Sequence, residues 1–168
     1  MTFQDELNYL IGSPISASKY IYGSIFHILF ARADGDTKLI CNGCQWAVLD
    51  EAGTVILHDE LALSSALIGD LFTGKRLRAV RADAAVLTLR FDDIVFHAFT
   101  TEEYHLDIHE GVALGSAEWQ AISDGARNSF ILFRPGHDAS GYEFSQYFDL
   151  TAVPWGAAYL KKQEGMNG

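Results

Sequence analysis

The chain has 168 residues, 49% hydrophobic and 20% charged, which suits one compact domain that folds without disulfides or a metal. It carries 22 Asp and Glu against 12 Lys and Arg, a formal charge of −10 that disfavours nucleic acid and anionic membranes as partners. No apolar run approaches the roughly 20 residues of a membrane-spanning helix. The start lacks the basic region of a signal peptide, so we expect a cytoplasmic protein.

The first part of the chain predicts a helix followed by strands. Residues 2–11 have helical spacing, with Thr2 and Asp5 in capping-box positions and Gly12 closing the helix. Runs rich in β-branched and aromatic residues, separated by turn residues, predict strands at 15–22, 24–30, 38–41, 46–49 and 54–57.

The same order of elements then recurs. Residues 59–72 predict a longer helix, which Gly74 closes. Further strands are predicted at 77–81, 86–91, 94–99, 119–123 and 129–133. The last two are predicted to pair as a hairpin that repeats the one at 46–49 and 54–57. Within 86–91, apolar and polar residues alternate, which is typical of a half-buried strand. Alternation at residues 142–146 predicts one added strand near the C-terminus.

Matching positions indicate two diverged copies of one unit. Gly12 and Gly74 are 62 residues apart, and Phe30 and Phe91 are 61 apart. Trp46 and Trp119 are 73 apart, which implies an insertion of about a dozen residues in the second copy. The alternative is a chance coincidence of two tryptophan hairpins.

We therefore predict an α+β fold of largely antiparallel sheet or sheets, built from two helix–β repeats with helices packed on the sheet. The predicted organisation is a single domain over residues 1–168. Its parts are pseudo-repeats at about 2–58 and about 59–134 and a C-terminal extension at 135–168.

A CxxC motif lies at Cys41-Asn42-Gly43-Cys44. A thioredoxin-like site needs a helix that begins at the motif, whereas the residues from Gln45 onward predict a strand. A structural zinc site needs two further ligands. We expect a tight turn with two reduced cysteines, and zinc or redox chemistry is the alternative.

A second cluster could bind a metal. On a strand, His105, Asp107 and His109 share one face, and on a helix the two histidines still do. Two imidazoles and a carboxylate form the ligand set of a 2-His-1-carboxylate site. The alternative is an ordinary amphipathic strand, because Leu106 and Ile108 alternate with these residues.

Motifs for covalent catalysis or cofactor binding are absent from the sequence. It has no serine-nucleophile elbow, phosphate loop or dinucleotide-binding glycine motif, so we expect no catalytic residues and no cofactor. His27 and His97 lie in apolar strands, where we expect half-buried, hydrogen-bonded side chains. The one basic cluster is flanked by acids, which favours a solvated strand edge; it comprises Lys75, Arg76, Arg78 and Arg81.

Acidic residues gather on predicted turns. Eight acids and no Lys or Arg lie between Phe91 and Ala126, and five acids and no Lys or Arg lie between Leu39 and Gly74. A surface so one-sided steers basic partners toward itself. The alternative role of these charges is solubility alone.

Two stretches of the first half, 10–15 and 22–30, and two of the second, 74–80 and 87–93, carry a resemblance. In the second half the pattern is a glycine, basic and hydrophobic residues, and then Leu-x-Leu-x-Phe-Asp-Asp. It resembles small bacterial immunity proteins of contact-dependent and polymorphic toxin systems, over roughly residues 7–100. The resemblance implies a non-enzymatic cytoplasmic protein that binds one toxin domain, and it carries over no particular binding residue.

We therefore expect an immunity-type protein that occludes the active site of a cognate basic toxin domain, such as a nuclease. The expected partner-binding carboxylates are Asp92, Asp93, Glu102, Glu103, Asp107 and Glu110. One alternative is a metal-dependent enzyme or metal-binding protein that uses His105, Asp107 and His109. The other is a non-catalytic assembly module whose sheet self-associates. The sequence leaves the oligomeric state and the number of sheets open.

Overall fold

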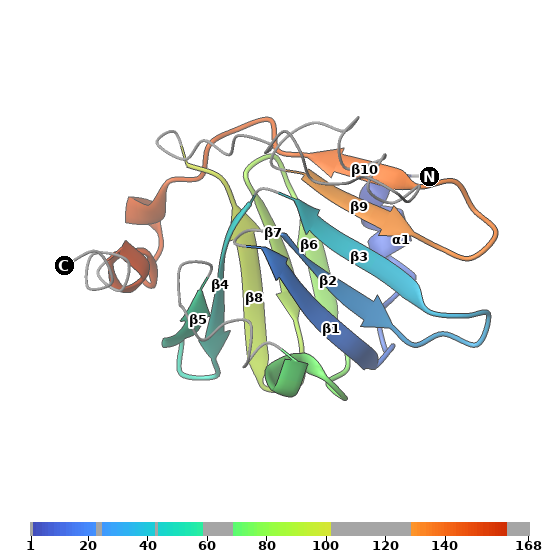
Figure 1. Ribbon diagram of the computed structural model, residues 1–168. Coiled ribbons are helices and arrows are strands. Elements are labelled where there is room, and N and C mark those ends of the chain that lie inside the picture. Colours follow the sequence, from blue (N-terminus) through green and yellow to red (C-terminus); the bar gives the residue numbers. More distant parts are fainter. Residues whose placement is uncertain (1, 23–24, 43, 59–68, 102–128, 161–168) are drawn as a thin grey trace.

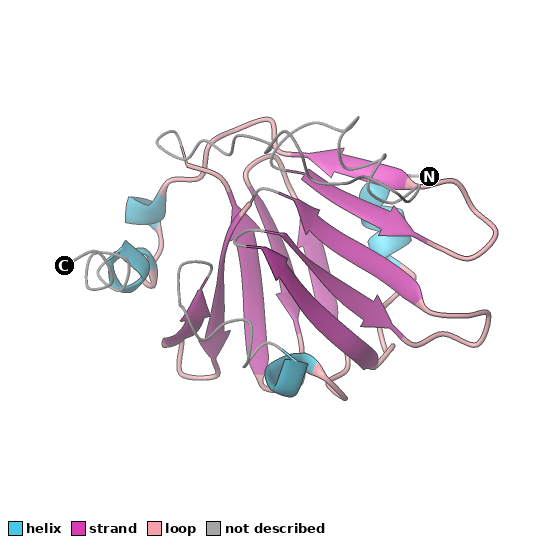
Figure 2. Ribbon diagram, in the orientation of Figure 1, coloured by secondary structure: helices cyan, strands magenta, loops and turns pink. Residues whose placement is uncertain are grey.

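Strands dominate the computed structural model, which describes residues 2–22, 25–42, 44–58, 69–101 and 129–160 (Figures 1 and 2). The elements in chain order are α1 (Phe3–Asn8), β1 (Ile15–Tyr22), β2 (Ile25–Phe30), β3 (Thr37–Asn42), β4 (Gln45–Asp50), β5 (Val55–His58), β6 (Ala79–Ala82), β7 (Val86–Arg90), β8 (Ile94–Phe99), β9 (Ser129–Phe133), β10 (Ser140–Glu143) and the 3-10 helix η1 (Leu150–Ala152). Residues 69–72 and 156–160 are also helical.

The strands form two antiparallel sheets of five strands each, which confirms the predicted α+β class. Sheet 1 has the order β1-β2-β3-β9-β10, and sheet 2 has the order β5-β4-β8-β7-β6. Their inner faces enclose one core, in which Ile28 and Leu132 from sheet 1 are clustered with Trp46 and Phe96 from sheet 2. The Trp46 and Phe96 rings lie 6.1 Å apart between centroids.

The two sheets exchange their hairpins. The meander β1-β2-β3 is extended by β9-β10, whereas the meander β6-β7-β8 is extended by β4-β5 from the first half of the chain. Each sheet therefore combines three strands of one half with two strands of the other. Figure 1 shows the late strands β9 and β10 beside β3, and the early strand β4 beside β8.

This exchange corrects one sequence prediction. We expected residues 129–133 to pair with residues 119–123, but β9 has β3 on one side and β10 on the other. The hairpin of the second half is therefore β9–β10. The strand predicted at residues 142–146 overlaps β10 but was placed too late in the chain, since β10 covers residues 140–143. Register places Phe130, and not Trp119, at the position that Trp46 holds in sheet 2. Trp119 itself lies outside the described residues.

Reciprocal backbone hydrogen bonds relate the two halves at the residues that follow their helices. The donors and acceptors are Gly12 N to Leu77 O (2.7 Å), Gly74 N to Ile15 O (2.8 Å), Ile15 N to Lys75 O (2.8 Å) and Leu77 N to Ser13 O (3.1 Å). Gly12 and Gly74 also share nearly the same positive φ, +90° and +86°, which favours glycine. Each bond has a counterpart 62 residues along the chain, the spacing of the two glycines. This is the pattern expected of a duplicated unit about a local two-fold axis near the Pro14–Arg76 bridge.

Helix α1 lies against one edge strand of each sheet. Its start is the predicted capping box, since the Asp5 amide donates to Thr2 Oγ1 and the Thr2 amide donates to the Asp5 carboxylate. The Gln4 side chain then bonds to the free edge of β6 as a neighbouring strand would. Its Nε2 donates to Val80 O (3.0 Å), and its Oε1 accepts from Ala82 N (2.7 Å). On the other side, Phe3 stacks on Tyr142 of β10 at 5.2 Å. The helix thus covers edges that would otherwise be open for pairing.

The C-terminal segment, residues 148–160, covers part of the outer face of sheet 2. Its Leu150, Trp155 and Tyr159 form a second buried cluster with Phe99 of β8 and Ala47 of β4. The segment turns tightly at Gly156, where a β-carbon would lie 1.7 Å from the carbonyl oxygen of Leu150. In Figure 1 this segment lies beside β4 and β5.

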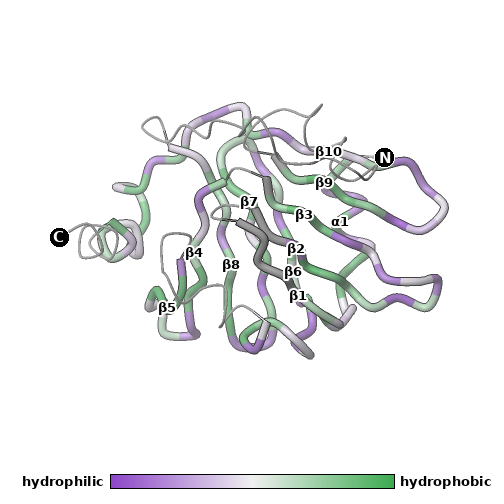
Figure 3. Tube along the Cα trace, in the orientation of Figure 1, coloured by the Kyte–Doolittle hydropathy of each residue, from purple (hydrophilic) through white to green (hydrophobic). Residues whose placement is uncertain are grey.

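The loop that joins β9 to β10 carries hydrophilic residues, as Figure 3 shows. In the described part of the chain, no helix has the length and hydrophobicity that crossing a membrane requires.

Candidate functional site

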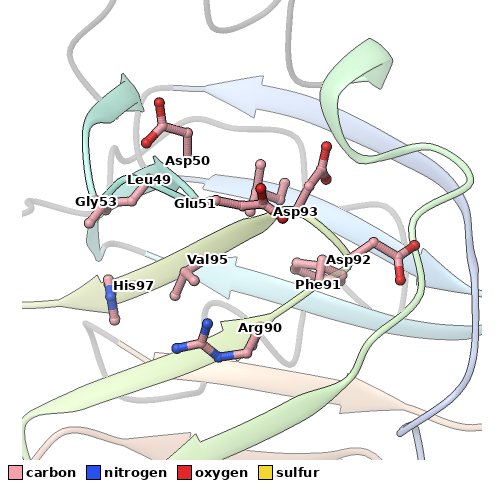
Figure 4. Close-up of a pocket in the computed structure, with 11 residues that line it drawn as sticks. Leu49, Asp50, Glu51, Gly53, Arg90, Phe91, Asp92, Asp93, Val95 and His97 are labelled. Atoms are coloured by element: carbon pink, nitrogen blue, oxygen red, sulfur yellow. The ribbon is translucent and has the colours of Figure 1, made fainter.

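A cavity of about 230 Å³ opens on the outer face of sheet 2, where β4 and β7 end in turns and β8 begins (Figure 4). Its walls come from two sources, the β4–β5 turn and the β7–β8 turn with the strand residues beside it. The lining residues are Leu49, Asp50, Glu51, Gly53, Arg90, Phe91, Asp92, Asp93, Ile94, Val95 and His97. Four of these residues are carboxylates, so the site joins both predicted acidic regions.

Local turn chemistry places the carboxylates. Asp50 ends β4 and accepts backbone N–H bonds from Ala52 (3.0 Å) and Thr54 (2.9 Å), which fixes the turn around Gly53 at φ +83°. Antiparallel pairing of β4 with β8 sets Asp50 opposite Ile94, directly after the two-residue turn Asp92-Asp93. The two turns therefore meet at one end of sheet 2.

The two predicted partner-binding residues that the structure describes are both ion-paired. Asp92 Oδ1 lies 2.6 Å from Arg78 Nε, and Asp93 Oδ1 lies 2.5 Å from Lys75 Nζ. The hydrogen bond from Arg78, followed by that from the Arg76 backbone, lowers the pKa of Asp92. The basic cluster beside β6 thus compensates both charges, and the partner-binding role of Asp92 and Asp93 stays a prediction. Figure 4 shows Asp92 pointing to the side away from His97.

Asp50 and Glu51 are the carboxylates at the cavity without a cationic partner. No Lys, Arg or His nitrogen of the described residues lies within 4.0 Å of either. The Glu51 side chain is exposed at the turn, and the exposed Arg90 lies across the cavity on β7. The negative character of the cavity therefore resides mainly in the β4–β5 turn.

His97 forms the inner wall of the cavity. Its Nδ1 shares a hydrogen bond of 2.9 Å with Thr88 Oγ1, and its ring stacks on Trp155 at 5.0 Å with planes 7° apart. Burial, with a smaller contribution from the Arg90 charge, lowers the pKa of His97 to about 4. The side chain is half-buried and hydrogen-bonded, as predicted, and near pH 7 it is a neutral, weak base.

The remaining predicted site residues fall outside the described part of the chain. They are Glu102, Glu103, His105, Asp107, His109 and Glu110. Their partner-binding and metal-binding roles stay predictions. Among the described residues, no group of three or more His, Cys, Asp or Glu side chains is placed to hold a metal ion.

The CxxC cysteines lie in the core between the sheets. Cys41 is the last but one residue of β3 and Cys44 precedes β4, and both are almost fully buried unbridged thiols within the main hydrophobic cluster. With exposed fractions of 1% and 0%, neither side chain reaches the protein surface. The two cysteines therefore contribute to the core between the sheets.

Sequence reasoning missed Asp50 and Glu51 as neighbours of Asp92 and Asp93. Both pairs lie at the end of a strand, β4 or β7, and the predicted repeat could not show that β4 pairs with β8 of the other half. The ion pairs were easier to anticipate. The β6–β7 register sets Ala79 opposite Arg90, which brings residues 75–78 alongside residues 91–93.

Comparison with known proteins gives no information about this site. No protein-family model, curated protein or solved structure matches the chain.

Proposed function

We propose that this chain is an immunity-type protein that acts in the cytoplasm without catalysis. It binds a cognate basic toxin domain, such as a nuclease, and occludes the active site of that domain. The observation that carries the proposal is the gathering of four carboxylates from two turns around one small cavity. The formal charge of −10 supports it, since such a charge attracts a cationic partner over long range.

The size of the cavity favours a side chain over a substrate. Its volume of about 230 Å³ is below the range of about 300–1,000 Å³ in which small-molecule pockets fall. Leu49, Ile94 and Val95 give it apolar walls below the acidic rim. A Lys or Arg side chain has the matching form, because its stem packs on apolar surface while its charged end stays at the rim.

The ion pairs indicate which carboxylate contributes most to binding a cationic partner. Arg78 and Lys75 already satisfy Asp92 and Asp93, so a partner cation gains less from them. Glu51 is exposed and without a cationic partner among the described residues, so it is the direct contact. The low pKa of His97 fits a binding wall better than a general base.

The test uses the toxin domain encoded next to this chain, in a catalytically inactive form, and measures binding by calorimetry. We expect Glu51→Lys to weaken binding at least about tenfold, because close charge pairs across interfaces couple by about 1.5 kcal/mol or more. Glu143→Lys is the matched control, since Glu143 is an exposed acid on β10 of the other sheet, and we expect less than about a twofold change. Wild-type protein that shows no saturable binding, or equal effects of the two variants, would contradict the proposal.

A further inference from the structure

A pair of arginines meets on one tyrosine ring at the loop end of sheet 1, away from the acidic cavity. The guanidinium carbon of Arg32 lies 3.8 Å from the Tyr9 ring centroid, and that of Arg134 lies 4.4 Å from it. The three residues come from the end of α1, the β2–β3 loop and the β9–β10 loop. The two loops touch, since a β-carbon on Gly35 would lie 3.0 Å from Cγ of Pro135.

The two positive charges contact the same ring and lack a compensating acid among the described residues. Because both carbons lie within 4.4 Å of one centroid, they are no more than about 8 Å apart. In the described residues, no carboxylate oxygen lies within 4.0 Å of either guanidinium. This is unusual for a chain in which acids outnumber Lys and Arg by 22 to 12. Like charges repel, so the arrangement is favoured when an anion joins it.

The hydrogen-bonding groups of the pair are largely unused. Arg32 Nη1 donates to Ser13 Oγ at 2.9 Å, and Arg134 makes no side-chain hydrogen bond to any described residue. The Nε atoms of both arginines are buried and lack a hydrogen-bond acceptor in this part of the chain. Unsatisfied buried donors call for an acceptor, and guanidinium groups match the oxygens of carboxylate or phosphate in geometry.

We propose that Arg32 and Arg134, held by Tyr9, form a binding site for an oxyanion, either a carboxylate or a phosphate. The ring fixes both guanidinium planes, which reduces the conformational freedom that binding would remove. The same loops carry Asp34, Asp36 and Asp138, so long-range attraction is weak and recognition depends on direct N–H···O contacts. Half-saturation in the millimolar range therefore follows for a small free anion. The site uses none of the residues of the acidic cavity, so it stands or falls independently of toxin binding.

The test is an NMR titration of the full chain with sodium phosphate and, separately, sodium acetate, with chloride adjusted to hold ionic strength constant. We expect saturable shifts of the Arg32 and Arg134 Nε–H signals, and the more tightly bound salt identifies the preferred oxyanion. Arg134→Gln should weaken binding at least about tenfold, and Arg134→Lys should also weaken it, because an ammonium cannot bind two oxygens in a planar fork.

Arg81→Gln is the matched control, since Arg81 is a well-exposed arginine on β6 and its loss should leave both titrations unchanged. Folding of each variant is checked by the dispersion of its amide spectrum. Absence of saturable shifts with both salts in the wild type would overturn the proposal. An Arg134→Lys protein that folds like the wild type and binds phosphate and acetate as tightly as the wild type does would also overturn it.

Discussion

Replacing His97 by glutamine should remove a large part of the acid sensitivity of this protein. His97 keeps a pKa of about 4 in the folded state against 6.5 ordinarily, because burial disfavours its charged form. Between these values the unfolded chain binds a proton that the folded protein does not. Stability therefore falls as the pH falls through this window. A single group with these two pKa values contributes a loss of about 2 kcal/mol between pH 7 and pH 5, and about 3 kcal/mol by pH 4.

The assay is urea denaturation at pH 7, 6 and 5, followed by far-UV circular dichroism. Tryptophan fluorescence is unsuitable because His97 stacks on Trp155 and a protonated imidazole quenches it. Glutamine retains a partner for Thr88 Oγ1, so the variant isolates the titration. The pKa values of Asp5, Asp92 and Asp149 are lowered from 3.8, so these groups lose their contribution only below the window. Parallel pH profiles for wild type and H97Q, or an NMR-measured pKa near 6.5 for His97, would refute the reasoning.

Three further predictions concern packing. Gln4→Ala removes both bonds to the β6 edge, so we expect a loss of about 1–3 kcal/mol in the free energy of unfolding and faster amide exchange at Ala82; unchanged exchange would contradict this. Gly156→Ala forces a β-carbon against the Leu150 carbonyl, so we expect the C-terminal segment to lose its packing against sheet 2. Increased tryptophan exposure to acrylamide would report that loss, and unaltered quenching would argue against it. Both cysteines should react with a thiol reagent only at the rate of global unfolding, measured by colour release in increasing urea, because both lie in the core; immediate reaction of the native protein would show otherwise.

Local signals in the sequence predicted local structure well. The Thr2 and Asp5 capping box, the alternation along β7 and the glycine that follows each helix depend on neighbouring residues, and the structure has all of them. The α+β class follows from the same elements. The matched spacing of Gly12 and Gly74 reappears as reciprocal backbone bonds.

The sequence did not allow us to predict which distant strands pair with each other. Both β4 and β9 are mainly apolar on both faces, so either one satisfies the hydrophobic pattern beside β3 or β8. Their actual partners are β8 and β3, from the other half in each case. The candidate site inherited this limit, since Asp92 and Asp93 were recognised while Asp50 and Glu51 were assigned to a separate acidic region. Trp119 attracted the hairpin prediction because tryptophan is rare, whereas Phe130 holds the structural position.

The exchange of hairpins between the sheets has a consequence for how this chain attains its structure. In this structure neither half of the polypeptide forms a five-stranded sheet by itself, so β4 and β5 take their places in sheet 2 only after β8 has been synthesised. Pairings between such distant stretches are slow to form and leave apolar surface uncovered meanwhile.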